Sequence, residues 1–196
     1  INLLCRFYDP DEGRILVNDI DIRQYALSDY RRLFGLVLQD LYLFPASIQE
    51  NLRAFRSEID DSAVQKAAEI GGVNQLIEAR PGGYHSILAE KGGNLSQGEK
   101  QLLAFTRAMA VDPKIMILDE ATSSVDPGTE LRIQKTLQKL LLGRTNFVVA
   151  HRLSTIRRAG QIILIRKGRI REKGSHQELM ALNGDYARLV REQMTQ

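Results

Sequence analysis

Residues 115–126 read IMILDEATSSVD, and this stretch decides the fold class. Four consecutive apolar residues, 115–118, are typical of a short strand that is buried on both faces, as strands of parallel sheets are. Two acids, Asp119 and Glu120, follow directly. In open α/β sheets, ligands bind at the carboxyl ends of the strands. The stretch therefore predicts a buried strand that delivers two carboxylates to a ligand-binding edge.

The adjacent carboxylates have two interpretations. Asp119 can hold Mg²⁺ through water while Glu120 polarises an attacking water, a division of labour that suits phosphoryl transfer. The alternative is a pair of solvated acids at the end of a strand. The pattern alone does not decide between them, because short motifs occur by chance.

Strand and helix patterns alternate on both sides of this stretch. Strand-like runs bounded by turn residues occupy 14–19, 33–40, 145–151 and 161–168, and helical periods with capping residues occupy 127–142 and 175–193. Such alternation predicts an α/β fold with a largely parallel sheet that is flanked by helices.

The pattern changes between residues 45 and 96. Three short amphipathic helices are predicted there, at 47–55, 61–70 and 73–79, and the region is punctuated by the glycine pairs 71–72, 82–83 and 92–93. We expect residues 45–96 to form a helical subdomain that is inserted into a sheet core made by residues 1–44 and 97–196.

The composition excludes several classes of protein. The 196 residues are enough for one domain with a sizeable core. The 27 Lys and Arg exceed the 24 Asp and Glu only slightly and are scattered, so no nucleic-acid partner is expected. The single cysteine, Cys5, excludes an internal disulfide and is interpreted as a small core residue rather than a reactive thiol. No apolar run approaches the ~20 residues that span a bilayer.

A second motif, LSQGE at 95–99, lies upstream of the acidic pair. Ser96 fits the N-cap of a helix and Glu99 its third position, which together form a capping box. A helix N-terminus with a serine hydroxyl and a nearby glycine amide can bind an anion. An ordinary capped helix is the alternative, and the motif by itself favours that alternative.

The combination of motifs closely resembles the ATP-binding-cassette (ABC) ATPases over essentially the whole chain. LSQGE followed by KQLLAFTRAM resembles their signature motif, and ILDEATSSVD resembles their Walker B strand and D-loop. Gln39, at the end of LFGLVLQD, matches the Q-loop glutamine, and His151 in VVAHRLST matches the switch histidine. Glu90 in AEKG stands where the exporter-type branch has its X-loop glutamate.

The resemblance implies a fold and a role for each matching residue. The fold would be P-loop NTPase-like, with a RecA-like core around the helical subdomain. Asp119 would order the Mg²⁺ shell, Glu120 would be the general base, and His151 would contact the γ-phosphate of ATP. Gln39 would sense metal and water and link the site to a membrane partner.

The resemblance also implies a second copy of the domain. The signature residues Ser96, Gln97, Gly98 and Glu99 would contact the γ-phosphate of the nucleotide held by the other copy. Asp126 would act across this dimer interface, although Asp126 followed by proline also fits a helix N-cap. The commonest signature is LSGGQ, so Gln97 and Glu99 depart from it, and Glu99 places a negative charge near a polyphosphate.

One expected element does not occur in these 196 residues. The phosphate-binding loop G-x-x-x-x-G-K-[ST], whose amides cradle the phosphates, is not found. We expect the chain to begin just after that loop, with residues 2–6 as the downstream turns of the helix that starts inside it. The 196 residues alone should then bind Mg-ATP weakly and hydrolyse it negligibly.

These motifs predict the nucleotide-binding domain of an ABC exporter at the cytoplasmic face of a membrane. It would dimerise head-to-tail, as a homodimer or heterodimer, and power a transmembrane domain that contacts the Q-loop and the X-loop near Glu90. Two alternatives are a non-catalytic cassette that supplies only its signature face and a soluble ABC ATPase of DNA repair or translation. The motifs do not identify a transported substrate.

Overall fold

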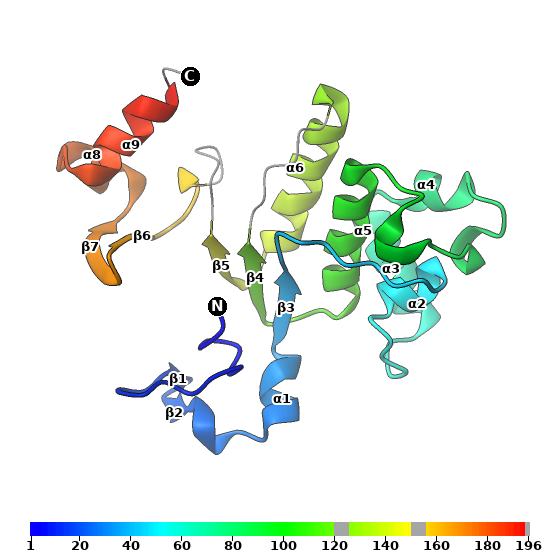
Figure 1. The fold of residues 1–196 in the computed structure, drawn as a ribbon, viewed down its shortest axis with the longest axis horizontal. Helices are drawn as coiled ribbons and strands as arrows, with labels where there is room; N and C mark the ends of the chain where they lie inside the picture. The colour runs from blue at the N-terminus through cyan, green and yellow to red at the C-terminus, as the bar shows by residue number, and fades with distance from the viewer. Residues whose placement is uncertain (120–125, 150–155, 195–196) are drawn as a thin grey trace. The chain divides into compact units, whose positions relative to one another are not determined.

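The computed structural model describes residues 1–119, 126–149 and 156–194 (Figure 1). The chain divides into two compact units. Among the described residues, unit 1 contains 1–119 and 126–148, and unit 2 contains 149 and 156–194. Within the described residues, no helix is both long enough and apolar enough to cross a membrane.

A three-stranded sheet forms the centre of unit 1. Its strands are β3 (Phe34–Val37), β4 (Ile115–Asp119) and β5 (Thr145–Val149), in the order β3-β4-β5. β3 and β4 are parallel, with Phe34 opposite Ile115 and Val37 opposite Leu118. The strands predicted within 33–40, at 115–118 and within 145–151 are confirmed, and so is the α/β class.

Both faces of β4 are covered, which explains its run of apolar residues. Side chains alternate between the faces of a strand. Met116 and Leu118 join the core beneath the helices, whereas Ile117 joins a second core on the opposite face. The buried members of that second core are Cys5, Ile22, Tyr30, Phe34 and Ile117. The prediction that Cys5 is a core residue is confirmed, and burial raises the pKa of its thiol.

Five helices of unit 1 share one hydrophobic core with the sheet. They are α2 (Ile48–Leu52), α3 (Asp61–Gly71), α4 (Asn74–Glu78), α5 (Gln97–Ala110) and α6 (Pro127–Leu141). α5 is central, because it packs against α2, α3, α6 and β3. A Cβ at Gly71 would lie 2.2 Å from Thr106 Oγ1, so glycine allows α3 to approach α5 closely. The helices predicted between 45 and 96 are confirmed.

Side chains of α6 stabilise the carboxyl end of α3. Arg132, Thr136 and Lys139 donate hydrogen bonds to the carbonyls of Gly72, Gly71 and Ile70. Those carbonyls lack partners within their own helix, and cations near a helix C-terminus are favourable. The helix that follows Asp126 is therefore tied to the helical region.

The N-terminal residues form a tight turn and a hairpin. Residues 1–7 carry the hydrogen bonds of a helix C-terminus, with Phe7 N–H donating to the Asn2 carbonyl and Arg6 N–H donating to the Leu3 carbonyl. Arg6 has φ +53°, as the residue after such a helix end does. The expected helical turn at 2–6 is thus present only as this terminal turn.

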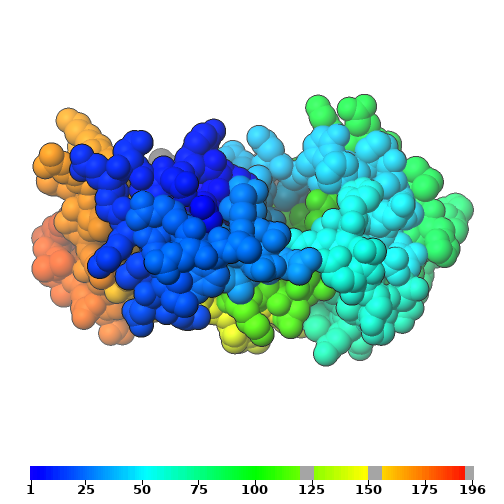
Figure 2. All heavy atoms as spheres, turned by 90° about the horizontal axis from the view of Figure 1, so that it is seen from below, coloured from blue at the N-terminus to red at the C-terminus, as the bar shows by residue number. Residues whose placement is uncertain are grey.

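The strand predicted at 14–19 is short and stands apart from the parallel sheet. β1 (Leu16–Val17) pairs antiparallel with β2 (Ile20–Asp21), and the 3-10 helix η1 (Ile22–Gln24) and α1 (Leu27–Arg32) then lead to β3. Figure 2 shows these N-terminal elements in blue on one side of unit 1 and α2 and α3 in cyan on the other.

Unit 2 consists of a hairpin and two helices. β6 (Ile162–Arg166) pairs antiparallel with β7 (Arg169–Gly174), and α8 (His176–Ala181) and α9 (Asp185–Met194) follow. The strand predicted at 161–168 is confirmed as β6, but it forms this hairpin rather than extending the parallel sheet. The Glu172 carboxylate accepts hydrogen bonds from the Asp185 and Tyr186 N–H groups. These hydrogen bonds cap the N-terminus of α9.

Candidate functional site

The predicted catalytic residues follow the carboxyl ends of three adjacent strands. β4 ends at Asp119, Gln39 lies two residues after β3, and His151 lies two residues after β5. The arrows of the three strands point the same way in Figure 1. The carboxyl ends of the three strands therefore lie at one edge of the sheet, the edge where open α/β sheets bind ligands. Glu120 and His151 themselves lie outside the described residues.

The strand register places Gln39 one step beyond Asp119 at this edge. Val37 is opposite Leu118, so continuing the pairing by one step places Gln39 one residue beyond the level of Asp119. Asp119 is half-buried and Gln39 is exposed. A carboxylate and an amide oxygen are ligands that Mg²⁺ accepts, and Mg²⁺ commonly uses one or two protein groups plus phosphates and water. Among the described residues no cluster of three His, Cys, Asp or Glu side chains could hold a metal by itself.

The first turn of α5 has the predicted capping box. Ser96 Oγ accepts a hydrogen bond from Glu99 N–H at 3.3 Å, and Glu99 Oε2 accepts one from Ser96 N–H at 2.7 Å. Ser96 and Gln97 are exposed, whereas Gly98 is buried. The turn thus offers a hydroxyl and the positive end of a 14-residue helix to solvent.

The direction of α5 places this turn at the same end of unit 1 as the strand ends. α5 leads into β4 through residues 111–114, which reverse the chain. In Figure 1 the start of α5 and the tips of β3, β4 and β5 all lie toward the top. The exposed turn at Ser96 and the carboxylate at Asp119 therefore belong to one end of unit 1.

Asp126 is the N-cap of α6, as the sequence indicated. Its carboxylate accepts a hydrogen bond from Thr129 N–H at 3.0 Å, and Pro127 occupies the first helical position. Hydrogen bonds from the Thr129 side chain and then its backbone N–H lower the pKa of Asp126. The carboxylate is therefore charged and exposed at the start of the helix.

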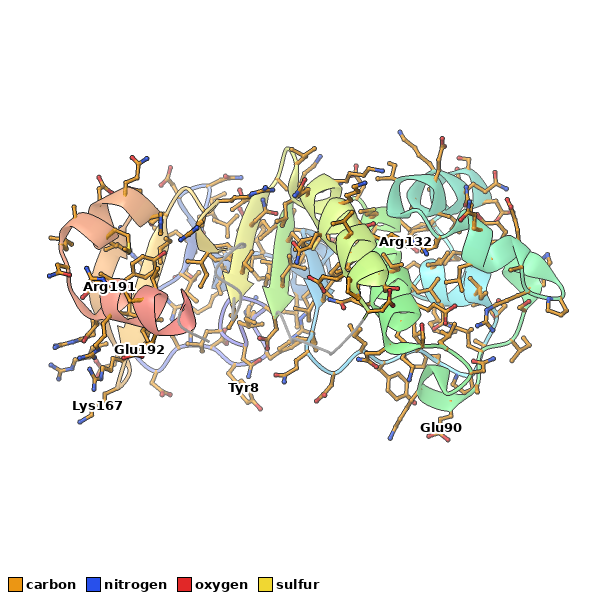
Figure 3. The ribbon with its side chains drawn as sticks, turned by 90° about the horizontal axis from the view of Figure 1, so that it is seen from above. Tyr8, Glu90, Arg132, Lys167, Arg191 and Glu192 are labelled. Carbon is orange, nitrogen blue, oxygen red and sulfur yellow. The ribbon has the colours of Figure 1, made fainter. Side chains whose placement is uncertain are left out.

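The segment that follows Gln39 lies beside the segment that precedes Glu90. Ile48 N–H donates to the Ser86 carbonyl at 3.0 Å, and Leu88 N–H donates to the Ala46 carbonyl at 2.9 Å. Glu90 starts the 3-10 helix η3 (Glu90–Gly92), and its side chain points outward in Figure 3. The predicted Q-loop and X-loop segments are thus joined by backbone hydrogen bonds.

An aromatic patch made by Tyr42, Phe44 and Phe55 borders this junction. The rings meet edge to face, with centroids 4.8 Å apart for Tyr42 and Phe44 and 4.9 Å apart for Phe44 and Phe55. All three side chains are exposed, Phe55 by 53%. Contiguous exposed apolar side chains make this patch a candidate contact surface.

Sequence reasoning missed the polar contacts beneath the aromatic patch. Arg107, on α5, donates hydrogen bonds to the Asn51 carbonyl at 2.9 Å, to Asn51 Oδ1 at 3.0 Å and to the Tyr42 carbonyl at 2.9 Å. Burial lowers the pKa of the Arg107 guanidinium. The available signal was that Arg107 is the sole charged residue within the run 102–111.

Comparison with known families gives one family for this fold. The model of the family described as "ABC transporter" matches residues 1–123. An uncharacterized ABC transporter ATP-binding protein, YfiC of Bacillus subtilis, is 44% identical over 192 residues, which are 98% of this chain and 32% of the relative. The ATP-dependent lipid A-core flippase of Chromohalobacter salexigens is 43% identical over 189 residues, 96% of this chain and 33% of the flippase.

A solved structure has the same fold. A bacterial Atm1-family ABC exporter with ATP bound superposes with a TM-score of 0.88 at 38% sequence identity, over 98% of this chain and 34% of the exporter chain. The chain thus spans about a third of the length of the relatives it matches. With its motifs at the ends of adjacent strands and a family match over residues 1–123, the chain belongs to the ABC transporter family.

Proposed function

We propose that the chain is a large part of the nucleotide-binding domain of an ABC exporter. This domain binds and hydrolyses ATP as a head-to-tail dimer and drives a transmembrane domain from the cytoplasmic face of a membrane. The observation that carries the proposal is the parallel pairing of β3 with β4, which brings the Gln39 segment and Asp119 to one edge of the sheet. Within it, residues 1–44 and 97–196 act as the RecA-like core, and 45–96 as the helical subdomain.

The residues at the sheet edge divide the work of phosphoryl transfer. Bound Mg²⁺ neutralises negative charge on the phosphates of ATP. Asp119, fixed at the end of a buried strand, is suited to hold the metal shell, and Gln39, one step further along the neighbouring strand, contacts metal and water. Glu120 acts as general base toward the attacking water, and His151 holds the γ-phosphate.

The start of α5 serves the nucleotide of the second domain. Ser96 is exposed, while its box with Glu99 fixes the first turn, so its hydroxyl and the N–H groups of residues 97 and 98 can meet the γ-phosphate across the dimer. Asp126 is exposed at the start of α6 and acts at the same interface. Each site then needs residues from two domains.

The transmembrane partner binds at the aromatic patch and the adjoining X-loop. The patch is exposed and apolar, and Glu90 projects from the neighbouring segment. Backbone hydrogen bonds join the Gln39 and Glu90 segments, so a partner there can contact both. The flippase relative and the exporter with ATP bound support a membrane role of this kind.

The test uses a protein in which a G-x-x-x-x-G-K-[ST] loop precedes Ile1. Glu120→Gln should lower ATP turnover by at least about 100-fold while ATP binding remains, because a general base contributes about 10²–10⁴. Ser96→Arg should also abolish turnover. Mixing the two variants should restore activity, since one composite site is then intact. The 196 residues alone, as the control, should turn over negligible ATP.

The second candidate is a non-catalytic cassette that supplies only its signature face. The exposed, capped turn at Ser96 supports it, because that turn alone would serve the partner's nucleotide. The same variants distinguish the two functions. If Ser96→Arg abolishes the activity of a complex and Glu120→Gln leaves it unchanged, the cassette acts through its signature face alone.

A further inference from the structure

Segment 42–47 is held against α5 by a polar pair, the buried Asn51 and the partly buried Arg107. Arg107 binds the Tyr42 carbonyl and also both the carbonyl and the side chain of Asn51. Asn51, which is 1% exposed, accepts from Phe44 N–H at 2.9 Å and donates to the Phe44 and Ser47 carbonyls, each at 3.0 Å. The two side chains thus bind backbone groups at both ends of this segment, the Tyr42 carbonyl and the Ser47 carbonyl. Removing either one leaves buried groups without partners.

The same segment reaches the turn that precedes Ser96. Leu43 is buried, and a Cβ placed on Gly92 would lie 3.1 Å from Leu43 Cδ1 and 3.3 Å from Leu95 Cδ1. Gly92 has φ +65°, a conformation that other residues rarely adopt. Leu43 is therefore packed directly against the turn 92–95, whose last residue adjoins the N-cap of α5.

The geometry makes segment 42–47 a bridge between two places on α5. Arg107 lies in the last turn of α5, and Ser96 precedes its first turn. The Tyr42 carbonyl accepts a hydrogen bond from Arg107. Leu43, the next residue, packs against the turn 92–95 that precedes Ser96. Tyr42 and Phe44 also carry two of the three rings of the aromatic patch.

We propose that Arg107 is a positioning residue which, with Asn51, fixes segment 42–47 and, through Leu43, the turn 92–95 that orients Ser96. Pressure of a partner on the aromatic patch then changes how Ser96 is presented to a nucleotide. The functional part of this inference rests on the exporter role proposed above. The mechanical part concerns this chain alone and can be measured without nucleotide.

The experiment is hydrogen–deuterium exchange, without nucleotide, of the protein in which a G-x-x-x-x-G-K-[ST] loop precedes Ile1. Arg107→Lys keeps the charge but cannot make the three hydrogen bonds of the planar guanidinium. The amides of 43–48 and of 93–100 should both exchange about tenfold faster, while those of α3 change less, because only the bridge opens locally.

Arg144→Lys is the matched control. Arg144 also donates to backbone carbonyls, those of Pro113 and Leu140, and pairs with Asp112, at a different place in unit 1. Its replacement should leave the exchange of 43–48 and 93–100 unchanged relative to the rest of unit 1. A general loss of stability would instead affect both variants alike.

Further variants keep the proposal falsifiable. Leu43→Ala should speed exchange at 93–100 with little change at 45–48, because it breaks only the second contact. If Arg107→Lys does not fold, Asn51→Ala provides the same comparison. The proposal is overturned if 43–48 loosens while 93–100 does not, or if exchange rises uniformly across unit 1. If the proposed exporter role is wrong, this would be seen in the separate ATPase assay, where turnover would not depend on Glu120.

Discussion

The first turns of α2 and α5 have the same chemistry and different surroundings. Both begin with Ser-x-x-Glu boxes, Ser47 with Glu50 and Ser96 with Glu99, and both boxes make the two reciprocal hydrogen bonds. Ser47 is only 8% exposed and lies on the segment that pairs with 86–88, whereas Ser96 faces solvent. In both turns the capping box fixes where the helix starts, whereas the burial of the serine decides whether its hydroxyl can contact a ligand.

A third box supports this conclusion. Ser175 and Glu178 cap α8 in unit 2 with the same pair of hydrogen bonds. Of these three boxes only the one at Ser96 lies in the stretch that resembles a family signature. The motif alone therefore predicts a helix start and says nothing further about function.

The largest effect should come from replacing each serine by arginine. Ser47→Arg forces a charge into a buried cap and should cost about 3 kcal/mol or more in free energy of unfolding. Ser96→Arg loses an exposed cap and should cost about 1 kcal/mol. Urea unfolding of the two variants measures the difference. Equal losses would show that the two turns do not differ in burial as described.

A smaller effect is expected on the pH dependence of stability at the first turn of α2. Hydrogen bonds from the Ser47 side chain and then its backbone N–H lower the pKa of Glu50. As pH falls, the unfolded chain therefore binds a proton at Glu50 before the folded chain does. The stabilisation from the charged Glu50 is complete above the unfolded pKa of about 4.3 and is lost as pH falls below that value. Glu50→Gln should be less stable than the parent at pH 7.

The difference between parent and Glu50→Gln should narrow as pH falls below about 4.3. Thermal unfolding of both chains between pH 3 and 7 provides the measurement. A gap that stays constant over this range would contradict the described hydrogen bonds.

The smallest effect is expected for Glu99→Gln. Glutamine keeps the acceptor of the box, so the free energy of unfolding should change by less than about 0.5 kcal/mol. The variant removes a negative charge beside the proposed polyphosphate site, so ATP affinity of the dimer should rise. Paired measurement of unfolding and of ATP binding tests this, and a large loss of stability would show that the charge itself holds the turn.

The central fold could be predicted because its signals are local. A run of apolar residues ending in Asp119 identifies β4, and Ser-x-x-Glu spacing identifies the start of α5. β7 could not be found in this way, because Arg169–Gly174 is polar and is a strand only through its pairing with β6. The N-terminal turn was likewise expected to be more helical than it is.

The candidate site could be predicted in part for a similar reason. The family resemblance assigns Gln39, Asp119 and Ser96 to the site, and the parallel register explains why the first two share an edge. Arg107 was missed because its partners, Tyr42 and Asn51, lie far from it in sequence and are recognised by their carbonyls and an amide rather than by an opposite charge. Contacts to backbone atoms leave little trace in a single sequence.

The parallel pairing of β3 with β4 has a consequence for how the chain folds. The two strands lie on either side of the entire helical region in the sequence, so their hydrogen bonds can form only after a long loop has closed. The contacts of α5 with α2 and α3 close shorter loops, so their entropic cost is smaller. We expect the helices to gather early and the sheet edge with Asp119 to be completed late, so that a partly folded chain would have its signature turn before its catalytic edge.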